Sequence, residues 1–207
     1  QDCWYWQIGY WIIEDALASV QNVNASADSV LSVPIKRVMS VDFTLKQKRS
    51  MRGRMRGGAR RSKDTVNPTY VTDSSDALTT PCTGRFTSPV DEMPGMDVVH
   101  FNVRVIIDAT QVGPFMDELC RAKPHTFRGF YGDQPPQTYE HNQITILETS
   151  QEPVVEESYE HYLYRYGDKP VVELNVIGEY LFERTPAFEE IKPRQVKEAL
   201  RDDDEDA

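Results

Sequence analysis

Hydrophobic and polar residues follow a helical repeat at the start of the chain and an alternating repeat in three later segments. Residues 4–23 carry one apolar stripe at helical spacing, which predicts a helix. Residues 98–109 and 171–183 alternate between apolar and polar side chains, as strands with one buried face do. Residues 35–45 alternate as well. On this last segment, one face is expected to carry Ile35, Arg37, Met39, Val41, Phe43 and Leu45.

The remaining segments complete a repeated order of elements. Residues 110–123 return to helical spacing, 143–152 indicate a strand, and a helix is expected near 188–200. Residues 154–166 fit a short helix and an extended segment equally well. A helix followed by two strands therefore occurs twice, and the first six residues of the 98–109 and 171–183 strands match in type at all but one position.

These patterns predict an α+β fold, a ferredoxin-like two-layer sandwich built from a duplicated helix–strand–strand unit. Strands with one polar face indicate an antiparallel sheet, with two helices on its apolar face and water on the other. We expect one domain over residues 1–200, with a long flexible insertion at 46–96 between the first two strands. A smaller insertion is expected at 124–142, and residues 201–207 form an acidic tail.

Charge is unevenly distributed along a chain of 207 residues whose net charge is −10. Residues 46–63 contain nine basic side chains and no acidic one. The arginines of this segment that we consider for binding are Arg52, Arg54, Arg56, Arg60 and Arg61. No apolar run approaches the length that spans a bilayer. With only three cysteines, the chain is not a disulfide-rich scaffold.

Candidate chemistry is sparse. The triplet Tyr139-Glu140-His141 recurs as Tyr159-Glu160-His161, but a metal site would need both to converge with a third ligand. Cys120 lies on the apolar stripe of its predicted helix, which favours a core position over a nucleophile. No nucleophile elbow and no phosphate-binding loop occurs. The sequence therefore predicts no enzyme, no cofactor and no bound metal.

The repeated order of elements resembles the periplasmic domains of PilO-like and GspM-like proteins, including uncharacterised planctomycete-type relatives. The stretches that carry the resemblance are Trp11–Leu17, Pro34–Val41, Val99–Val105, Gly113–Leu119 and Val172–Tyr180. The resemblance implies a non-catalytic scaffold of type IV pilus or type II secretion assembly at the inner membrane, on its periplasmic side. It implies a homodimer or a heterodimer with a related subunit. The resemblance also implies a preceding membrane anchor, with which a chain that begins at Gln1 within helical sequence is consistent.

Two binding hypotheses follow. Trp4 and Trp11 on the first helix are candidate interaction residues, because they would be exposed if that helix did not pack. The alternative is a ferredoxin-like nucleic-acid-binding domain whose Arg/Gly-rich segment 46–63 tracks phosphates. The predicted open sheet face lacks the aromatic platform on which RNA bases stack, so nucleic acid is the less favoured partner.

Overall fold

The structure is a computed structural model that describes residues 2–43, 68, 70–71, 96–128 and 133–198. Most of the 46–96 segment, with its arginines, and the acidic tail at 201–207 lie outside the described residues. In chain order the elements are α1 (Asp2–Asn24), β1 (Ile35–Asp42), β2 (Met96–Asp108), η2 (Ala109–Gln111), α2 (Val112–Leu119), β3 (Lys123–Phe127), β4 (Gln137–His141), β5 (Ile144–Pro153), β6 (Val171–Glu183) and α3 (Pro186–Ile191).

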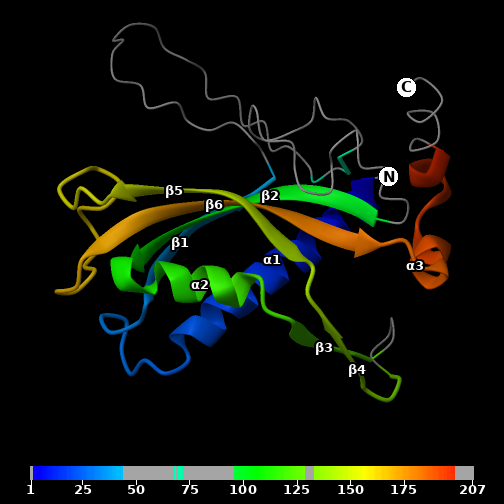
Figure 1. Ribbon diagram of the computed structural model, residues 1–207, viewed down its shortest axis with the longest axis horizontal. Helices are drawn as coiled ribbons and strands as arrows, with labels where there is room; N and C mark the ends of the chain where they lie inside the picture. Colours follow the sequence, from blue (N-terminus) through cyan, green and yellow to red (C-terminus); the bar gives the residue numbers. More distant parts are fainter. Residues whose placement is uncertain (1, 44–67, 69, 72–95, 129–132, 199–207) are drawn as a thin grey trace, which may run out of the picture.

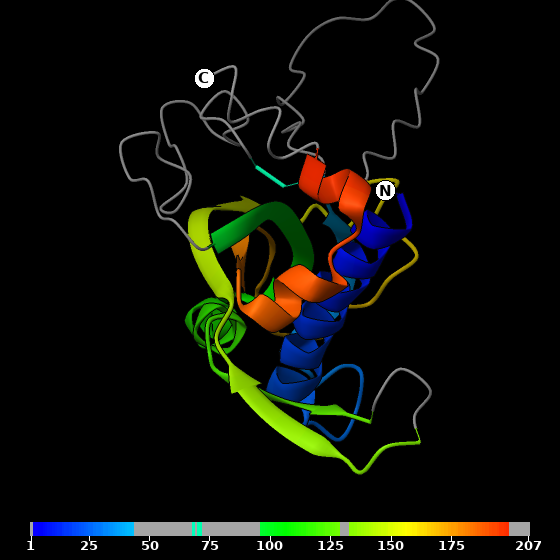
Figure 2. The ribbon, with the colours of Figure 1, turned by 90° about the vertical axis from the view of Figure 1, so that its right-hand side faces the viewer.

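Four strands form one antiparallel sheet in the order β1-β2-β6-β5. The helices α1 and α2 contact each other and lie on the same side of this sheet (Figure 1). A view rotated by 90° shows α3 next to the first turns of α1 (Figure 2). The α+β class, the antiparallel sheet and the helix-covered face are thus confirmed.

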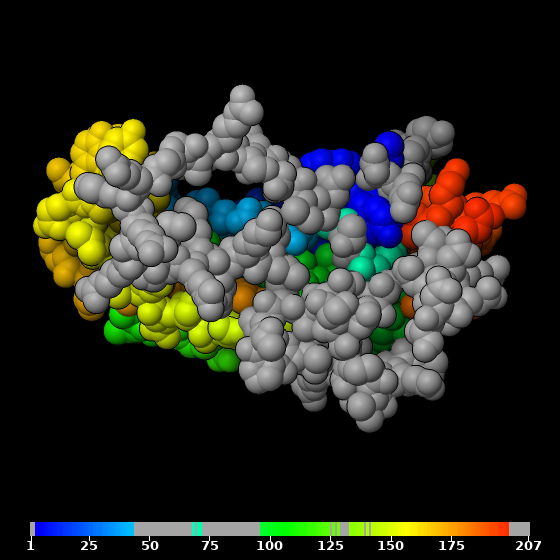
Figure 3. All heavy atoms as spheres, turned by 90° about the horizontal axis from the view of Figure 1, so that it is seen from above, coloured from blue at the N-terminus to red at the C-terminus, as the bar shows by residue number. Residues whose placement is uncertain are grey.

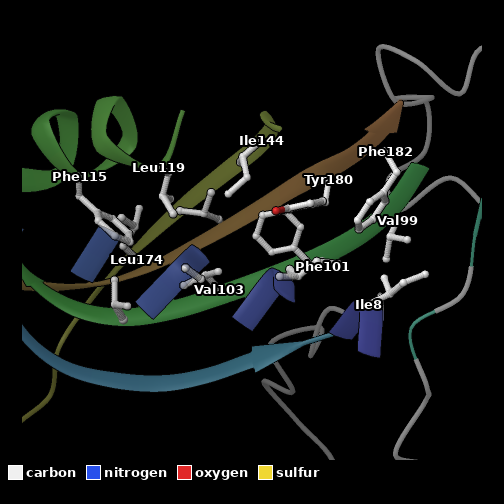
Figure 4. Close-up of a cluster of buried hydrophobic side chains, with 14 of the residues drawn as sticks. Ile8, Val99, Phe101, Val103, Phe115, Leu119, Ile144, Leu174, Tyr180 and Phe182 are labelled. Carbon is white, nitrogen blue, oxygen red and sulfur yellow. The ribbon is translucent and has the colours of Figure 1, made fainter. Parts of the chain in front are cut away.

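The core lies between the sheet and the two helices (Figure 4). The central strands β2 and β6 run side by side over 13 paired residues, and their inward side chains alternate as the sequence predicts. The β2 side chains that are fully buried on this face are Val99, Phe101, Val103, Val105 and Ile107. Ile8 and Ile12 of α1, and Phe115 and Leu119 of α2, fill the other half of the core.

The face assignment that the alternation predicts for β1 holds at Ile35, Val41 and Phe43 but is wrong between them. Register shifts between Ile35 and Arg37, and again between Val38 and Ser40, break the two-residue repeat. Val38 consequently packs against the core, while the Arg37 side chain extends over a tyrosine of the β5–β6 loop. Each shift reverses the face of the residues that follow it, which a strict alternation cannot represent.

Two further elements differ from the prediction. The expected helix near 188–200 ends at Ile191 and resumes only at residues 194–198, because Pro193 lacks the backbone N–H that a continuous helix needs. The segment expected as an insertion at 124–142 contains the separate hairpin β3–β4, which pairs over five residues. The ambiguous stretch at 154–166 forms a series of turns.

A short piece of the segment expected to be flexible belongs to the core. Tyr70 is buried, and the backbone N–H of Val71 donates to the carbonyl of Val98 at 2.8 Å. Pro68 lies against α1 at Gly9, where an added Cβ would approach its ring to 3.0 Å. Residues 70–71 therefore continue along β2 beyond the point where its pairing with β1 ends.

Gly178 of β6 packs closely against a side chain of the neighbouring strand β2. A Cβ added there would lie 2.9 Å from two ring carbons of the fully buried Phe101. We expect Gly178→Ala to lower the free energy of unfolding by about 1–3 kcal/mol through overpacking, measured by urea denaturation. Gly113→Ala is the matched control, because a Cβ there meets nothing within 4 Å. Equal stability of the two variants would contradict this assignment.

Candidate interaction surfaces

The candidate residues Trp4 and Trp11 lie in an aromatic cluster at the beginning of α1. Trp4 is 8% exposed, its Nε1–H donates to the Tyr70 hydroxyl at 3.0 Å, and its ring meets those of Trp11 and Phe188. Trp11 is partly buried and contacts Phe182. The structure therefore places both tryptophans in or against the core, where they hold α1 to the sheet and to α3.

A buried ion-pair network fixes the same end of the molecule. The carboxylate of Asp97, at the start of β2, accepts from Lys192 Nζ and from Arg184 Nε, each at 2.6 Å. The side chains of Asp97 and Lys192 are each 1% exposed, and Lys192 also bonds Glu189. Burial, followed by the negative charge of Asp97, raises the pKa of Tyr70. This network attaches the chain after β6 to the first residues of β2.

The opposite face of α1 carries a second apolar stripe, which we call the outer stripe. It comprises Trp6, Tyr10, Ile13 and Leu17, spaced by four, three and four residues so that they align along one side of the helix. Trp6 is 54% exposed, Tyr10 58% and Leu17 45%. Single exposed apolar side chains are common on protein surfaces, whereas the outer stripe is an aligned row that includes two large aromatic side chains.

The flanks of the outer stripe are almost uncharged. Gln7, Ala18 and Gln21 are neutral, and Glu14 on the same flank accepts from the Tyr10 hydroxyl at 3.3 Å. Because the chain carries a net charge of −10, most of its surface repels a second copy. The outer stripe is a surface where that repulsion is weak and apolar contact is available.

The sheet face away from the helices is partly buried, and it carries polar side chains among the buried apolar residues Val98, Ile106 and Ile177. His100 of β2 and Glu179 of β6 are cross-strand partners, with His100 Nε2 3.3 Å from the Glu179 carboxylate and both side chains at most 2% exposed. Arg104 and Glu173 form a second ion pair at 3.1 Å. The expectation of a fully solvated face is therefore wrong at its centre, although the described strands place no Phe, Tyr or Trp there.

This polar face also holds buried atoms that lack a hydrogen-bond partner within the described part of the chain. They are Ser40 Oγ, His100 Nδ1, Asn102 Oδ1, Arg104 Nε and Asn175 Oδ1. A buried polar atom without a partner lowers stability by about 1–3 kcal/mol. Additional donors and acceptors at this face would therefore stabilise the fold.

Between the helices and the sheet lies an interior polar contact. The Tyr180 hydroxyl donates to the buried carboxylate of Asp15 at 2.5 Å, which links β6 to α1. Burial and then the negative charge of Asp15 raise the pKa of Tyr180. Burial also lowers the pKa of Lys123 and raises that of the Cys120 thiol. A raised thiol pKa leaves little of the reactive thiolate at neutral pH.

The described ranges hold no group of three or more His, Cys, Asp or Glu side chains able to share a metal ion. His161, from one of the two repeated triplets, bonds the Tyr166 hydroxyl through Nδ1 at 2.8 Å. Arg52, Arg54, Arg56, Arg60 and Arg61 lie outside the described residues. None of the described helices is long and apolar enough to cross a membrane.

The fold and these surfaces define the chain as a two-layer α+β domain with an exposed apolar helix face. In comparisons with known proteins, no family model, no curated protein and no solved structure matches it.

The outer stripe was not predicted from the sequence, because the prediction considered only the buried stripe of residues 4–23. The signal was nevertheless present: Trp6, Tyr10, Ile13 and Leu17 show helical spacing, half a turn away from Trp4, Ile8 and Ile12. One apolar stripe of α1 packs against the sheet, and the outer stripe is exposed at Trp6, Tyr10 and Leu17.

Proposed function

We propose that this chain is a non-catalytic interaction domain of an inner-membrane component of type IV pilus or type II secretion assembly, on its periplasmic side. The envelope role rests on the resemblance to PilO-like and GspM-like proteins, as does the membrane anchor that would precede the domain. The interaction role rests on one observation, the outer stripe of α1. The domain acts by pairing with a second copy of itself or a related subunit along that stripe.

A second part of the proposal concerns the topology of the fold. We propose a ferredoxin-like duplication in which α1 precedes β1–β2 and α2 precedes β5–β6. The strand order supports it, because the second strand of each unit lies at the centre of the sheet and the first lies at an edge. In this scheme the hairpin β3–β4 is an addition within the second unit.

Pairing through the outer stripe is consistent with how proteins associate. Aromatic side chains in a fully covered patch supply most of the binding free energy at interfaces, and Trp and Tyr are the residues most enriched there. A pair held by apolar contact depends little on ionic strength. Nucleic-acid binding by the basic segment would instead weaken steeply as salt rises.

Sedimentation velocity tests the proposal. We expect the wild-type chain to form a dimer at micromolar concentrations, and the double variant Trp6→Glu/Leu17→Glu to sediment as a monomer, because two carboxylates would be desolvated on pairing. Leu163→Glu is the matched control, since Leu163 is 74% exposed but belongs to the β5–β6 loop. A monomeric wild type, or a double variant that still dimerises, would disprove pairing of two copies through this stripe.

A further inference from the structure

The loop between β5 and β6 presents tyrosines at the end of the molecule opposite α3 (Figure 3). Tyr159 is 87% exposed and Tyr162 46%. Their ring centroids lie 5.8 Å apart at an interplanar angle of 37°. We call these two residues the tyrosine pair. Leu163, at 74% exposure, extends the same surface.

The loop that holds the tyrosine pair is internally bonded. The backbone N–H groups of His161 and Tyr162 donate to the carbonyl of Ser158 at 3.0 and 2.9 Å. Beneath them, His161 and Tyr166 are buried and joined by the 2.8 Å hydrogen bond between Nδ1 and the hydroxyl. The exposed rings are therefore presented by a fixed turn, and binding to them costs little ordering of the chain.

This loop already binds two guanidinium groups from its own chain. The guanidinium of Arg37 lies 3.8 Å from the ring centroid of Tyr164, and its Nη1 donates to the carbonyl of Glu160 at 3.0 Å. Arg165 Nη1 donates to the carbonyls of Tyr162 and Tyr164 at 3.2 and 3.1 Å. An aromatic ring beside a backbone carbonyl is thus the arrangement with which the loop holds Arg37, and two backbone carbonyls hold Arg165.

The tyrosine pair repeats the aromatic part of that arrangement with two exposed side chains. Its neighbours in the sequence include Glu156, Glu157 and Glu160, which are all exposed. Tyrosine faces attract cations through the ring quadrupole, and a planar guanidinium stacks on them better than an ammonium does. We propose that the tyrosine pair is a docking site for an arginine-bearing segment of a partner protein, with the three carboxylates neutralising its charge.

The site belongs to other elements than the outer stripe and is independent of the proposed function. Its probe is a fluorescein-labelled hexa-arginine peptide, with hexa-lysine as the matched cation, measured by fluorescence anisotropy. We expect tighter binding of the arginine peptide, and a loss of about tenfold in affinity for Tyr159→Leu/Tyr162→Leu. Ile191→Ala, at a side chain of α3 that is 59% exposed and belongs neither to this loop nor to the outer stripe, should bind as the wild type does.

Unspecific attraction to a chain of net charge −10 acts equally on all these variants. Wild-type affinity in the double variant, or equal affinity of the wild type for both peptides, would overturn the proposal. A second measurement needs no variant: the ring protons of Tyr159 and Tyr162 should shift in NMR spectra of the wild-type chain on titration with the arginine peptide. Unshifted ring signals at saturation would overturn the proposal as well.

Discussion

Replacement of Asp97 by alanine is expected to lower the free energy of unfolding by about 3–5 kcal/mol, measured by urea denaturation followed by circular dichroism. The reason is the ammonium of Lys192, which is 1% exposed and would lose the carboxylate 2.6 Å away. The buried ammonium would keep its desolvation cost, with only the partly exposed Glu189 left to attract it. Because Lys192 and Arg184 both converge on Asp97, we also expect the contact between α3 and β2 to loosen.

The double variant Asp97→Leu/Lys192→Met distinguishes the destabilisation caused by one unpaired buried charge from the net contribution of the intact ion pair to the free energy of unfolding. Removing both charges leaves neither buried and unpaired, so we expect the double variant to recover most of the stability that Asp97→Ala loses. Arg194→Met serves as the control, because its ion pair with Glu198 is exposed and worth little. A double variant as unstable as Asp97→Ala would show that packing, and not the unpaired charge, dominates at this site.

The second large effect is expected at Trp4. Trp4→Ala should lower the free energy of unfolding by about 3–5 kcal/mol, because it empties the centre of the aromatic cluster and removes the partner of the Tyr70 hydroxyl. Tyr70→Phe should cost about 1–3 kcal/mol, since it leaves only the buried indole N–H of Trp4 without an acceptor. Both are measured by thermal and urea denaturation.

Trp6→Ala is the matched control for Trp4→Ala, since the two tryptophans lie two residues apart on one helix but on opposite faces. Trp6 is 54% exposed, and its removal should change the stability of the monomer by no more than about 0.5 kcal/mol. The free energies of unfolding of the two variants should be compared at a protein concentration where the chain is monomeric. If both variants lost equal stability, the assignment of one face of α1 to the core and the other to the surface would be wrong.

The long strands show what the sequence pattern can predict. The bounds and inward faces of β2 and β6 follow from alternation, because neither strand slips against the other over its length. The alternation fails on β1, whose two register shifts leave no trace in the order of apolar and polar residues. The hairpin β3–β4 was missed because its five-residue strands are too short and too polar for a clear repeat.

The candidate sites show what the pattern of apolar and polar residues cannot predict, namely contacts between segments that are distant in the sequence. Trp4 and Trp11 could be placed on one side of a helix from the sequence, but only the positions of Tyr70 and Phe188 show that this side is covered. Tyr70 comes from a segment whose polar composition predicts flexibility. The two guanidinium groups on the β5–β6 loop likewise depend on contacts, one of which joins Arg37 to Glu160 across 123 positions.

The central ladder between β2 and β6 also governs how the chain reaches its native state. Its partners, such as Phe101 and Gly178, are far apart in sequence, whereas β5 and β6 are neighbours along the chain. Contacts between distant residues form late, because closing a large loop loses chain entropy before any contact repays it. The second half of the molecule can therefore assemble first and act as the template onto which β2, and then β1, adds from the first half.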